Sequence, residues 1–264
     1  MADYQVTAYP VAKLPVPGWE CFFARNDTSF RDLIFYVWVI RDDDRIVLVD
    51  TGPPSDDDDF RRLKEACQGV DPRSEMKRLL SVDAVLEQEG ITAEQIDALL
   101  ITQTITYHSG CLLPQYFPRA KVYLSRQGMM ELLLESVGHP PRDLYFTSAS
   151  WTFLWSLLRE NRLFFIDEPV AVLPDLFFET TGGHHPGSAA VTVKTAEGTV
   201  AILETAFLKE NIDEEMPIGV AEDAAVCRRV IKRFKQQCDL VLAAHDNTIL
   251  DRFENGVIRV DREG

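Results

Sequence analysis

The stretch Leu99-Leu-Ile-Thr-Gln-Thr-Ile-Thr-Tyr-His-Ser-Gly110 joins a short apolar run to a polar turn. The run from Asp97 to Thr102 is rich in leucine and isoleucine and is followed at once by polar residues, which is typical of a buried strand. The turn then sets the imidazole of His108 among several hydroxyl side chains. Such a turn either is a hydrogen-bonded strand end with a structural role or contains a reactive or ligand-binding histidine.

Four further segments carry polar residues at or beside the ends of apolar runs, and each contains a carboxylate or an imidazole. They are Arg45-Ile-Val-Leu-Val-Asp-Thr-Gly52, Gly183-His-His-Pro-Gly-Ser188, Val200-Ala-Ile-Leu-Glu-Thr-Ala206 and Leu240-Val-Leu-Ala-Ala-His-Asp246.

In this order, the segments resemble the metallo-β-lactamase superfamily, in which a strand ending in Thr-His-x-His-x-Asp-His-x-Gly holds one or two zinc ions. The other segments resemble its Asp-Thr-Gly, Gly-His-Thr-Pro-Gly-Ser, Gly-Asp-Ala and Gly-His-Asp motifs. The resemblance covers about residues 35 to 250 and is strongest to the lactonase-like branch, which includes acyl-homoserine lactonases. It implies an α/β fold, an αββα sandwich of two mixed sheets with helices outside.

Most of the family's metal ligands are replaced in this chain. Isoleucine has no lone pair, threonine is a poor neutral ligand, and a tyrosine phenol would have to lose a proton with a pKa near 10. Zinc prefers histidine, cysteine or carboxylate, so the resemblance predicts that the two-metal site is lost. The alternatives left open are one zinc, iron or manganese ion on the three remaining histidines, or no metal. The family's seven ligand positions correspond here to Gln103, Ile105, Tyr107, His108, His184, Thr205 and His245.

Two residues beside these positions are expected to support the site. The resemblance implies that Asp50 orients a ligand imidazole from behind, as carboxylates commonly do. The alternative is that Asp50-Thr-Gly52 is simply a turn in which Gly52 takes a positive φ. His185 stands where the family has threonine, which predicts a place at the pocket rim. Glu204 would add a carboxylate only if its strand end were shifted, since neighbouring strand residues face opposite ways.

The expected roles of the candidate residues divide into three groups. Tyr107 and His108 are the catalytic candidates, because a neutral histidine beside hydroxyls can act as a general base. His108, His184 and His245 are the metal candidates. The predicted pocket lining is Gln103, Ile105, Thr205, His185 and Asp50.

Composition limits the class of protein and of partner. With 264 residues, of which 46% are hydrophobic and 26% charged, the chain can bury a sizeable core. A net charge of −15 argues against nucleic acid and anionic membranes as partners. The five cysteines include no C-x-x-C pair, which favours reduced thiols over disulfides or a cysteine zinc site. The N-terminus has no signal pattern and the apolar runs are too short to span a membrane, so we expect a cytoplasmic protein.

The periodicity alternates strands with helices over one domain, residues 1–264, and an aromatic-rich helical insertion is expected at about 126–175. Its helices are predicted at Met129–Leu134 and Trp151–Leu158; its aromatics either line a pocket or dimer surface or pack as core. Other helices are expected from near Phe60 and over Asp223–Cys238. Strands are expected at Tyr4–Val11, Leu33–Val39, Ile46–Val49, Ala98–Ile101, Lys121–Leu124, Ala189–Lys194, Thr199–Leu203, Leu240–Ala243 and Gly256–Val260.

Two functional hypotheses follow. In the first, the chain is a catalytically silent or altered relative that binds a small carbonyl-bearing molecule or a partner subunit, or forms a homodimer. In the second, it is a mononuclear metal-dependent hydrolase of a lactone or ester that uses His108, His184 and His245. Leu208 replaces a tyrosine of the family's lactonases, which weakens the link to lactones in particular. The replacement of four of the family's seven metal ligands favours the first hypothesis.

Overall fold

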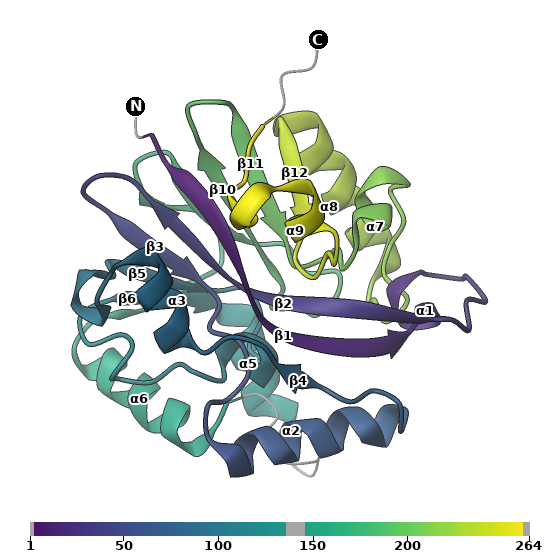
Figure 1. The fold of residues 1–264 in the computed structure, drawn as a ribbon, viewed down its shortest axis with the longest axis horizontal. Coiled ribbons are helices and arrows are strands. Elements are labelled where there is room, and N and C mark those ends of the chain that lie inside the picture. Colours follow the sequence, from purple (N-terminus) through teal and green to yellow (C-terminus); the bar gives the residue numbers. More distant parts are fainter. Residues whose placement is uncertain (1–2, 136–145, 261–264) are drawn as a thin grey trace.

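The protein is a four-layer αββα sandwich, in which two sheets pack face to face and helices cover their outer faces (Figure 1). The computed structural model describes residues 3–135 and 146–260. This architecture agrees with the fold expected from the sequence.

The first sheet has seven strands in the order β4-β1-β2-β3-β5-β6-β7. Strands β1 to β3 pair antiparallel, and β3, β5, β6 and β7 are parallel to one another. The bounds are Lys77–Arg78 for β4, Gln5–Pro17 for β1, Phe30–Arg41 for β2, Ile46–Val49 for β3, Ala98–Ile101 for β5, Lys121–Ser125 for β6 and Leu163–Ile166 for β7. The observed β1 and β2 are longer than expected because their antiparallel pairing continues from Gln5↔Arg41 to Pro17↔Phe30.

The second sheet has five strands in the order β12-β11-β10-β9-β8. Only β11 and β12 pair in parallel. The bounds are Leu240–Ala243 for β12, Thr199–Leu203 for β11, Ala189–Lys194 for β10, Leu176–Thr180 for β9 and Val170–Leu173 for β8. Within the described residues β12 is the last strand, so the expected strand at Gly256–Val260 is wrong. Val257 makes only an isolated bridge to Thr7, after a 3-10 turn over Glu254–Gly256.

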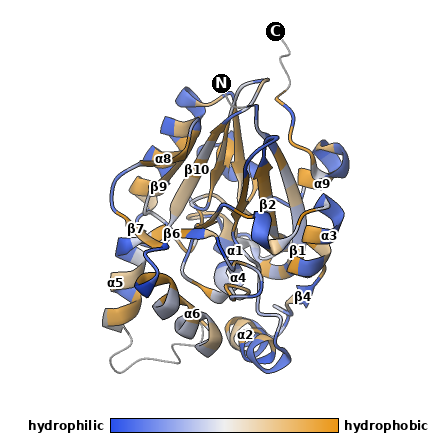
Figure 2. Ribbon diagram, turned by 90° about the vertical axis from the view of Figure 1, so that its left-hand side faces the viewer, coloured by the Kyte–Doolittle hydropathy of each residue, from blue (hydrophilic) through white to orange (hydrophobic). Residues whose placement is uncertain are grey.

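Three hydrophobic clusters fill the spaces between the four layers. Along β5, Leu99 and Ile101 pack toward the outer helices, whereas Ala98 and Leu100 pack between the sheets. This is the period-two alternation of a strand covered on both faces. Figure 2 shows the same division, with hydrophobic residues along the strands and hydrophilic residues on the outer surfaces of the helices.

The helices cover the sheets through amphipathic faces. Helix α8 (Ala224–Gln237) begins after Asp223, which caps it as expected. Helix α2 (Asp57–Val70) begins three residues earlier than predicted because Asp56 caps it, so the remaining aspartates lie in its first turn, where the helix dipole favours acids. The others are α1 (Gly18–Cys21), α3 (Val82–Glu89), η1 (Ala93–Gln95), α4 (Thr106–Ser109), α5 (Arg126–Glu135), α6 (Ser148–Arg159), α7 (Lys209–Asp213) and α9 (Ile249–Arg252).

The insertion contains the two expected helices, as α5 and α6. Phe146 and Phe153 are buried in the core under the first sheet, and Trp151 packs against that core. Trp155 is 65% exposed. Most of these aromatics therefore form core, while Tyr145 and His139 lie outside the described residues. Among the described residues, no helix is both long enough and apolar enough to cross a membrane.

Candidate metal centre

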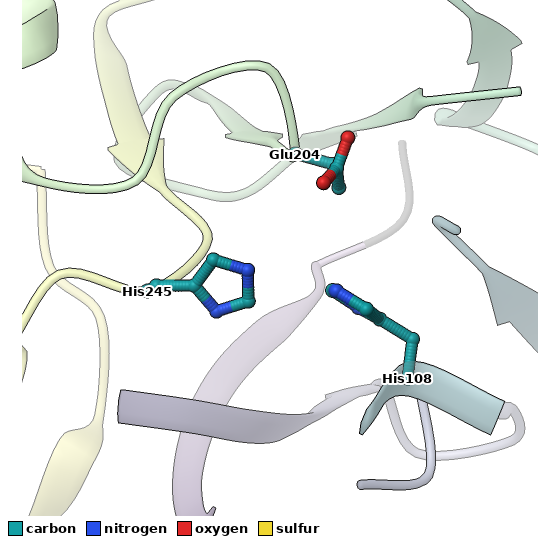
Figure 3. A group of neighbouring side chains, drawn as sticks. All are labelled: His108, Glu204 and His245. Carbon is teal, nitrogen blue, oxygen red and sulfur yellow. The ribbon is translucent and has the colours of Figure 1, made fainter. Parts of the chain in front are cut away.

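Two imidazoles and a carboxylate meet at the edge of the sandwich where several strands end. His108 lies in α4 just beyond β5, Glu204 directly follows β11, and His245 comes two residues after β12. Their ligand atoms all lie within 4.8 Å of one another. Figure 3 shows the three side chains pointing toward a common point. We call this group the central triad.

Asp50 supports His108 from behind. Its Oδ2 lies 2.8 Å from His108 Nδ1 and accepts a hydrogen bond of 2.6 Å from the Thr102 hydroxyl, while its Oδ1 accepts from the Thr102 amide at 2.8 Å. Because a carboxylate only accepts, Nδ1 carries the hydrogen and Nε2 is left to face the triad. Burial lowers the pKa of His108, but the charge and hydrogen bond of Asp50 outweigh it, so that the pKa is raised.

His245 is held by the backbone and by aromatic rings. Its Nδ1 lies 3.3 Å from the carbonyl oxygen of Ile34, which leaves Nε2 for the triad. The rings of Phe35 and Phe207 lie 4.4 and 5.3 Å from its own, centroid to centroid. Burial in these surroundings, with His108 close by, lowers the pKa of His245 to about 3. His245 is therefore neutral near pH 7, the form in which an imidazole binds metal.

Glu204 is fully buried and faces the triad without any shift of its strand. Along β11, Val200 and Ile202 lie between the sheets, and the next residue in that alternation is Glu204. Its amide still bonds to the Ala189 carbonyl, so the ladder continues through it. The expectation that Glu204 could reach the site only if its strand end were shifted was wrong. It matched Thr205 to the family's aspartate, and it therefore assigned the inward-facing position to Thr205 instead of Glu204. The alternation of inward-facing and outward-facing side chains along β11 could have identified Glu204.

His184 lies behind the triad, paired with Glu204. Its Nδ1 is 2.5 Å from Glu204 Oε1 and 3.5 Å from the amide nitrogen of Gln103. Burial lowers the pKa of His184, which keeps the ring neutral. Burial alone would raise the pKa of Glu204, but its interaction with His184 outweighs that effect and lowers it. The carboxylate is thus charged, and the predicted third histidine acts on the triad through Glu204.

The other predicted residues take several places around this centre. Gln103 is buried against His184, and Thr205 is fully buried in the turn that follows β11. Ile105 and Tyr107 are half-buried, and the Tyr107 ring lies 5.3 Å from that of Phe35. His185 is half-buried, with its ring 4.4 Å from that of His184. Sequence reasoning missed Phe35 and Phe207, since nothing local distinguishes them from core aromatics.

Two buried atoms of the triad have no hydrogen-bond partner among the described residues. They are His108 Nε2 and Glu204 Oε2. Leaving a buried polar atom unsatisfied costs about 1–3 kcal/mol, and more for a charged group. The cost is removed if a cation stands between the two atoms, so this pair is the feature of the site that most needs a ligand.

Comparisons with known proteins agree with the fold. The sequence model described as "Metallo-beta-lactamase superfamily" matches residues 33–102. A search of curated proteins finds no match. An N-acyl homoserine lactone hydrolase, solved with the product N-hexanoyl-L-homoserine at its catalytic metal centre, has a TM-score of 0.76 and 16% identity over 98% of this chain and 100% of that chain.

Two further solved structures are similar. A probable metal-dependent hydrolase from Staphylococcus aureus has a TM-score of 0.72 and 14% identity over 100% of this chain and 99% of that one. A dizinc quorum-quenching lactonase in complex with a product has a TM-score of 0.67 and 14% identity, with 100% and 94% covered. The chain is therefore a protein of the metallo-β-lactamase fold.

Proposed function

We propose that the chain is a metal-dependent hydrolase of a lactone or ester, with one divalent ion held by His108, Glu204 and His245. The observation that carries the proposal is the pair of buried, unpartnered atoms, His108 Nε2 and Glu204 Oε2, that face each other across the triad. This assignment keeps the mononuclear hypothesis from the sequence but replaces His184 by Glu204 as the third ligand.

The donor set fits such an ion. Two histidines and one glutamate are a ligand set of catalytic zinc sites that keep an open position, and two histidines with a carboxylate also suit iron(II). Both imidazoles use Nδ1 for a supporting hydrogen bond, to Asp50 and to the Ile34 carbonyl, which fixes the ring orientation and leaves Nε2 free to coordinate. The charged Glu204 carboxylate would compensate part of the charge of a divalent ion.

The residues do not fit a second ion in the family's arrangement. Gln103 and Ile105 stand at two histidine positions, and the Gln103 amide is turned to His184. Threonine at position 205 is a poor neutral ligand. We therefore propose an altered site that holds one ion.

The chain's own groups suit hydrolysis of a small, partly apolar carbonyl compound. A bound ion would polarise the carbonyl and lower the pKa of a water molecule. Phe35 and Phe207 flank His245 and exclude bulk water from the imidazoles. Tyr107 and Ile105 are the half-buried residues of the same turn, so a substrate that reaches His108 from solvent passes them. Tyr107 would orient the carbonyl group there.

One observation favours a second candidate function. In it, the chain is a catalytically silent relative that binds a small molecule, a second copy of itself or a partner subunit. The Nδ1 atoms of His108, His184 and His245 are each held by a protein acceptor, so the imidazoles are partly satisfied without an ion.

We also propose a cytoplasmic location, since all five cysteines, which lie within the described residues, are free thiols.

Metal analysis tests the proposal. The chain is purified without a metal-binding tag, and zinc, iron and manganese are measured in the parent, in His108→Ala/His245→Ala and in the control Glu179→Gln, whose carboxylate pairs with Arg233. We expect the parent and the control each to bind one equivalent more than the double variant, which should also lose hydrolysis of model lactones or esters. A parent that stays free of triad-bound metal after zinc, iron(II) and manganese are supplied refutes the hydrolase and favours the silent relative.

A further inference from the structure

A second group of ligand-type side chains lies beside the central triad without sharing a residue with it. It consists of Glu131 on α5, His185 in the turn between β9 and β10, and Glu222 in the loop before α8. Their ligand atoms also lie within 4.8 Å of one another. We call this group the rim triad. His185 was expected at the pocket rim, but no sequence motif pointed to either glutamate.

The backbone is built to hold these three side chains together. Gly128 of α5 and Gly187 of the turn pack so closely that a Cβ added at Gly187 would lie 2.4 Å from Gly128 Cα. Glu131 follows Gly128 by three residues, about one helical turn, and so projects from the same face of α5 toward the turn. On the other side, the amide of Glu222 donates to the carbonyl of His184. The rim triad is therefore fixed through main-chain contacts on both sides of His185.

The two distances from His185 in the rim triad are compatible with ligands around one ion. His185 Nδ1 is 3.6 Å from Glu131 Oε1 and 3.4 Å from Glu222 Oε1. Charged N–H···O bonds are shorter, about 2.7–2.9 Å. Two atoms about 2.1 Å from one ion and at the tetrahedral angle are about 3.4 Å apart, which matches the observed spacing.

The burial of Glu131 is a separate indication. Its side chain is only 9% exposed, and within the described residues its one charged partner is His185, at 3.6 Å. A buried carboxylate requires compensation by a cation or by good hydrogen bonds. In contrast, His185 is 27% and Glu222 45% exposed, so an ion can reach Glu131 from solvent between them.

We propose that Glu131, His185 and Glu222 form a second divalent-cation site, for Mn²⁺ or Zn²⁺, that is distinct from the central triad. Two carboxylates and one imidazole are ligands that both ions accept. The charges of the two carboxylates equal that of one such ion, whereas a proton on His185 balances only one of them. The proposal does not rest on the hydrolase activity, because the two triads share no ligand.

The rim triad is tested by isothermal titration calorimetry in the His108→Ala/His245→Ala background. Mn²⁺ and Zn²⁺ are titrated in separate experiments. We expect one equivalent of either ion to remain there. Adding Glu131→Gln and Glu222→Gln should weaken its binding by at least about 10- to 100-fold, the effect of losing even an outer-shell partner. Glu65→Gln/Glu75→Gln, two exposed acids on and after α2, is the control for general attraction of cations to a chain of net charge −15.

The outcomes separate the two proposals. If the background variant binds no ion, or if both glutamine pairs weaken binding equally, the rim triad is refuted, whatever the parent binds. If Glu131→Gln/Glu222→Gln in the otherwise native chain lowers the stoichiometry by one while His108→Ala/His245→Ala does not, the rim site stands and the hydrolase fails. Circular dichroism of each metal-free variant checks that it folds.

Discussion

Replacing Glu204 by glutamine should abolish most of the stabilisation that a metal ion confers. Glu204→Gln keeps the size of the side chain and an acceptor for His184 Nδ1, but it removes the charge and the free oxygen that face His108. An ion present at 100 times its dissociation constant stabilises the folded state by about 2.7 kcal/mol. If the variant binds about 100-fold more weakly, the same concentration gives about 0.4 kcal/mol.

This difference is large enough to measure by thermal unfolding. For a chain of this size 1 kcal/mol shifts the melting temperature by about 2–4 °C, so the metal-induced shift should be about 5–11 °C in the parent and about 1–2 °C in the variant. Without metal, Glu204→Gln should melt within a few degrees of the parent, since the unpartnered Oε2 is gone while an acceptor for His184 Nδ1 remains. The control is Glu179→Gln, the same change on β9 of the same sheet, where the carboxylate pairs with Arg233.

The measurement is differential scanning fluorimetry with EDTA and with added zinc or manganese, in the Glu131→Gln/Glu222→Gln background to exclude the rim triad. A metal-induced shift in Glu204→Gln equal to that of the parent would refute the assignment of Glu204 as a ligand. A metal-free variant several degrees less stable than the parent would show that Glu204 serves to hold His184 instead.

Three further predictions concern single residues. Asp50 raises the pKa of His108 in the folded state, so the stabilisation from this pair is present below about pH 6.5 and is lost as pH rises through the folded pKa. In urea titrations with EDTA, the difference in unfolding free energy between the parent and Asp50→Asn should therefore shrink from pH 6 to pH 8. A constant difference would contradict this. Gly52→Ala should cost about 1–3 kcal/mol in the same assay, because φ is +70° and the new Cβ would lie 2.5 Å from Val11 Cγ2; an unchanged midpoint would show that the turn can relax. Burial, with Asp71 nearby, raises the pKa of Glu20 to about 7. The parent should therefore lose stability relative to Glu20→Gln as pH rises from about 4.5 to 7, and an equal difference between their melting temperatures at pH 5 and pH 8 would contradict this.

Much of the fold could be predicted because each strand carries its own pattern. Short apolar runs such as Ile46–Val49 and Ala98–Ile101 coincide with β3 and β5 as they stand in the structure. The start of α2 and the end of the chain were misjudged for local reasons. Any of four consecutive aspartates can cap a helix, and the segment Gly256–Val260 makes only one bridge, from Val257 to Thr7 of β1.

The candidate site was predicted in part, through motifs whose polar residues lie at strand ends. His108 and His245 meet as expected, and Asp50 lies behind His108. The place of Glu204 was misjudged by one residue, and in a strand one residue is the difference between the two faces. Glu131 and Glu222 could not be found at all, since α5 and the loop before α8 approach His185 only through packing.

The sequence by itself determined the strands, the helices and the order of the polar segments, because these depend on residue type and local periodicity. Only the tertiary structure decided which side chains share a site. The triads combine residues from strand ends, turns and helices up to 137 positions apart, from His108 to His245. Their convergence depends on sheet register, on the direction of each strand's last side chain and on the close packing of Gly128 against Gly187, and none of these is encoded within a single segment.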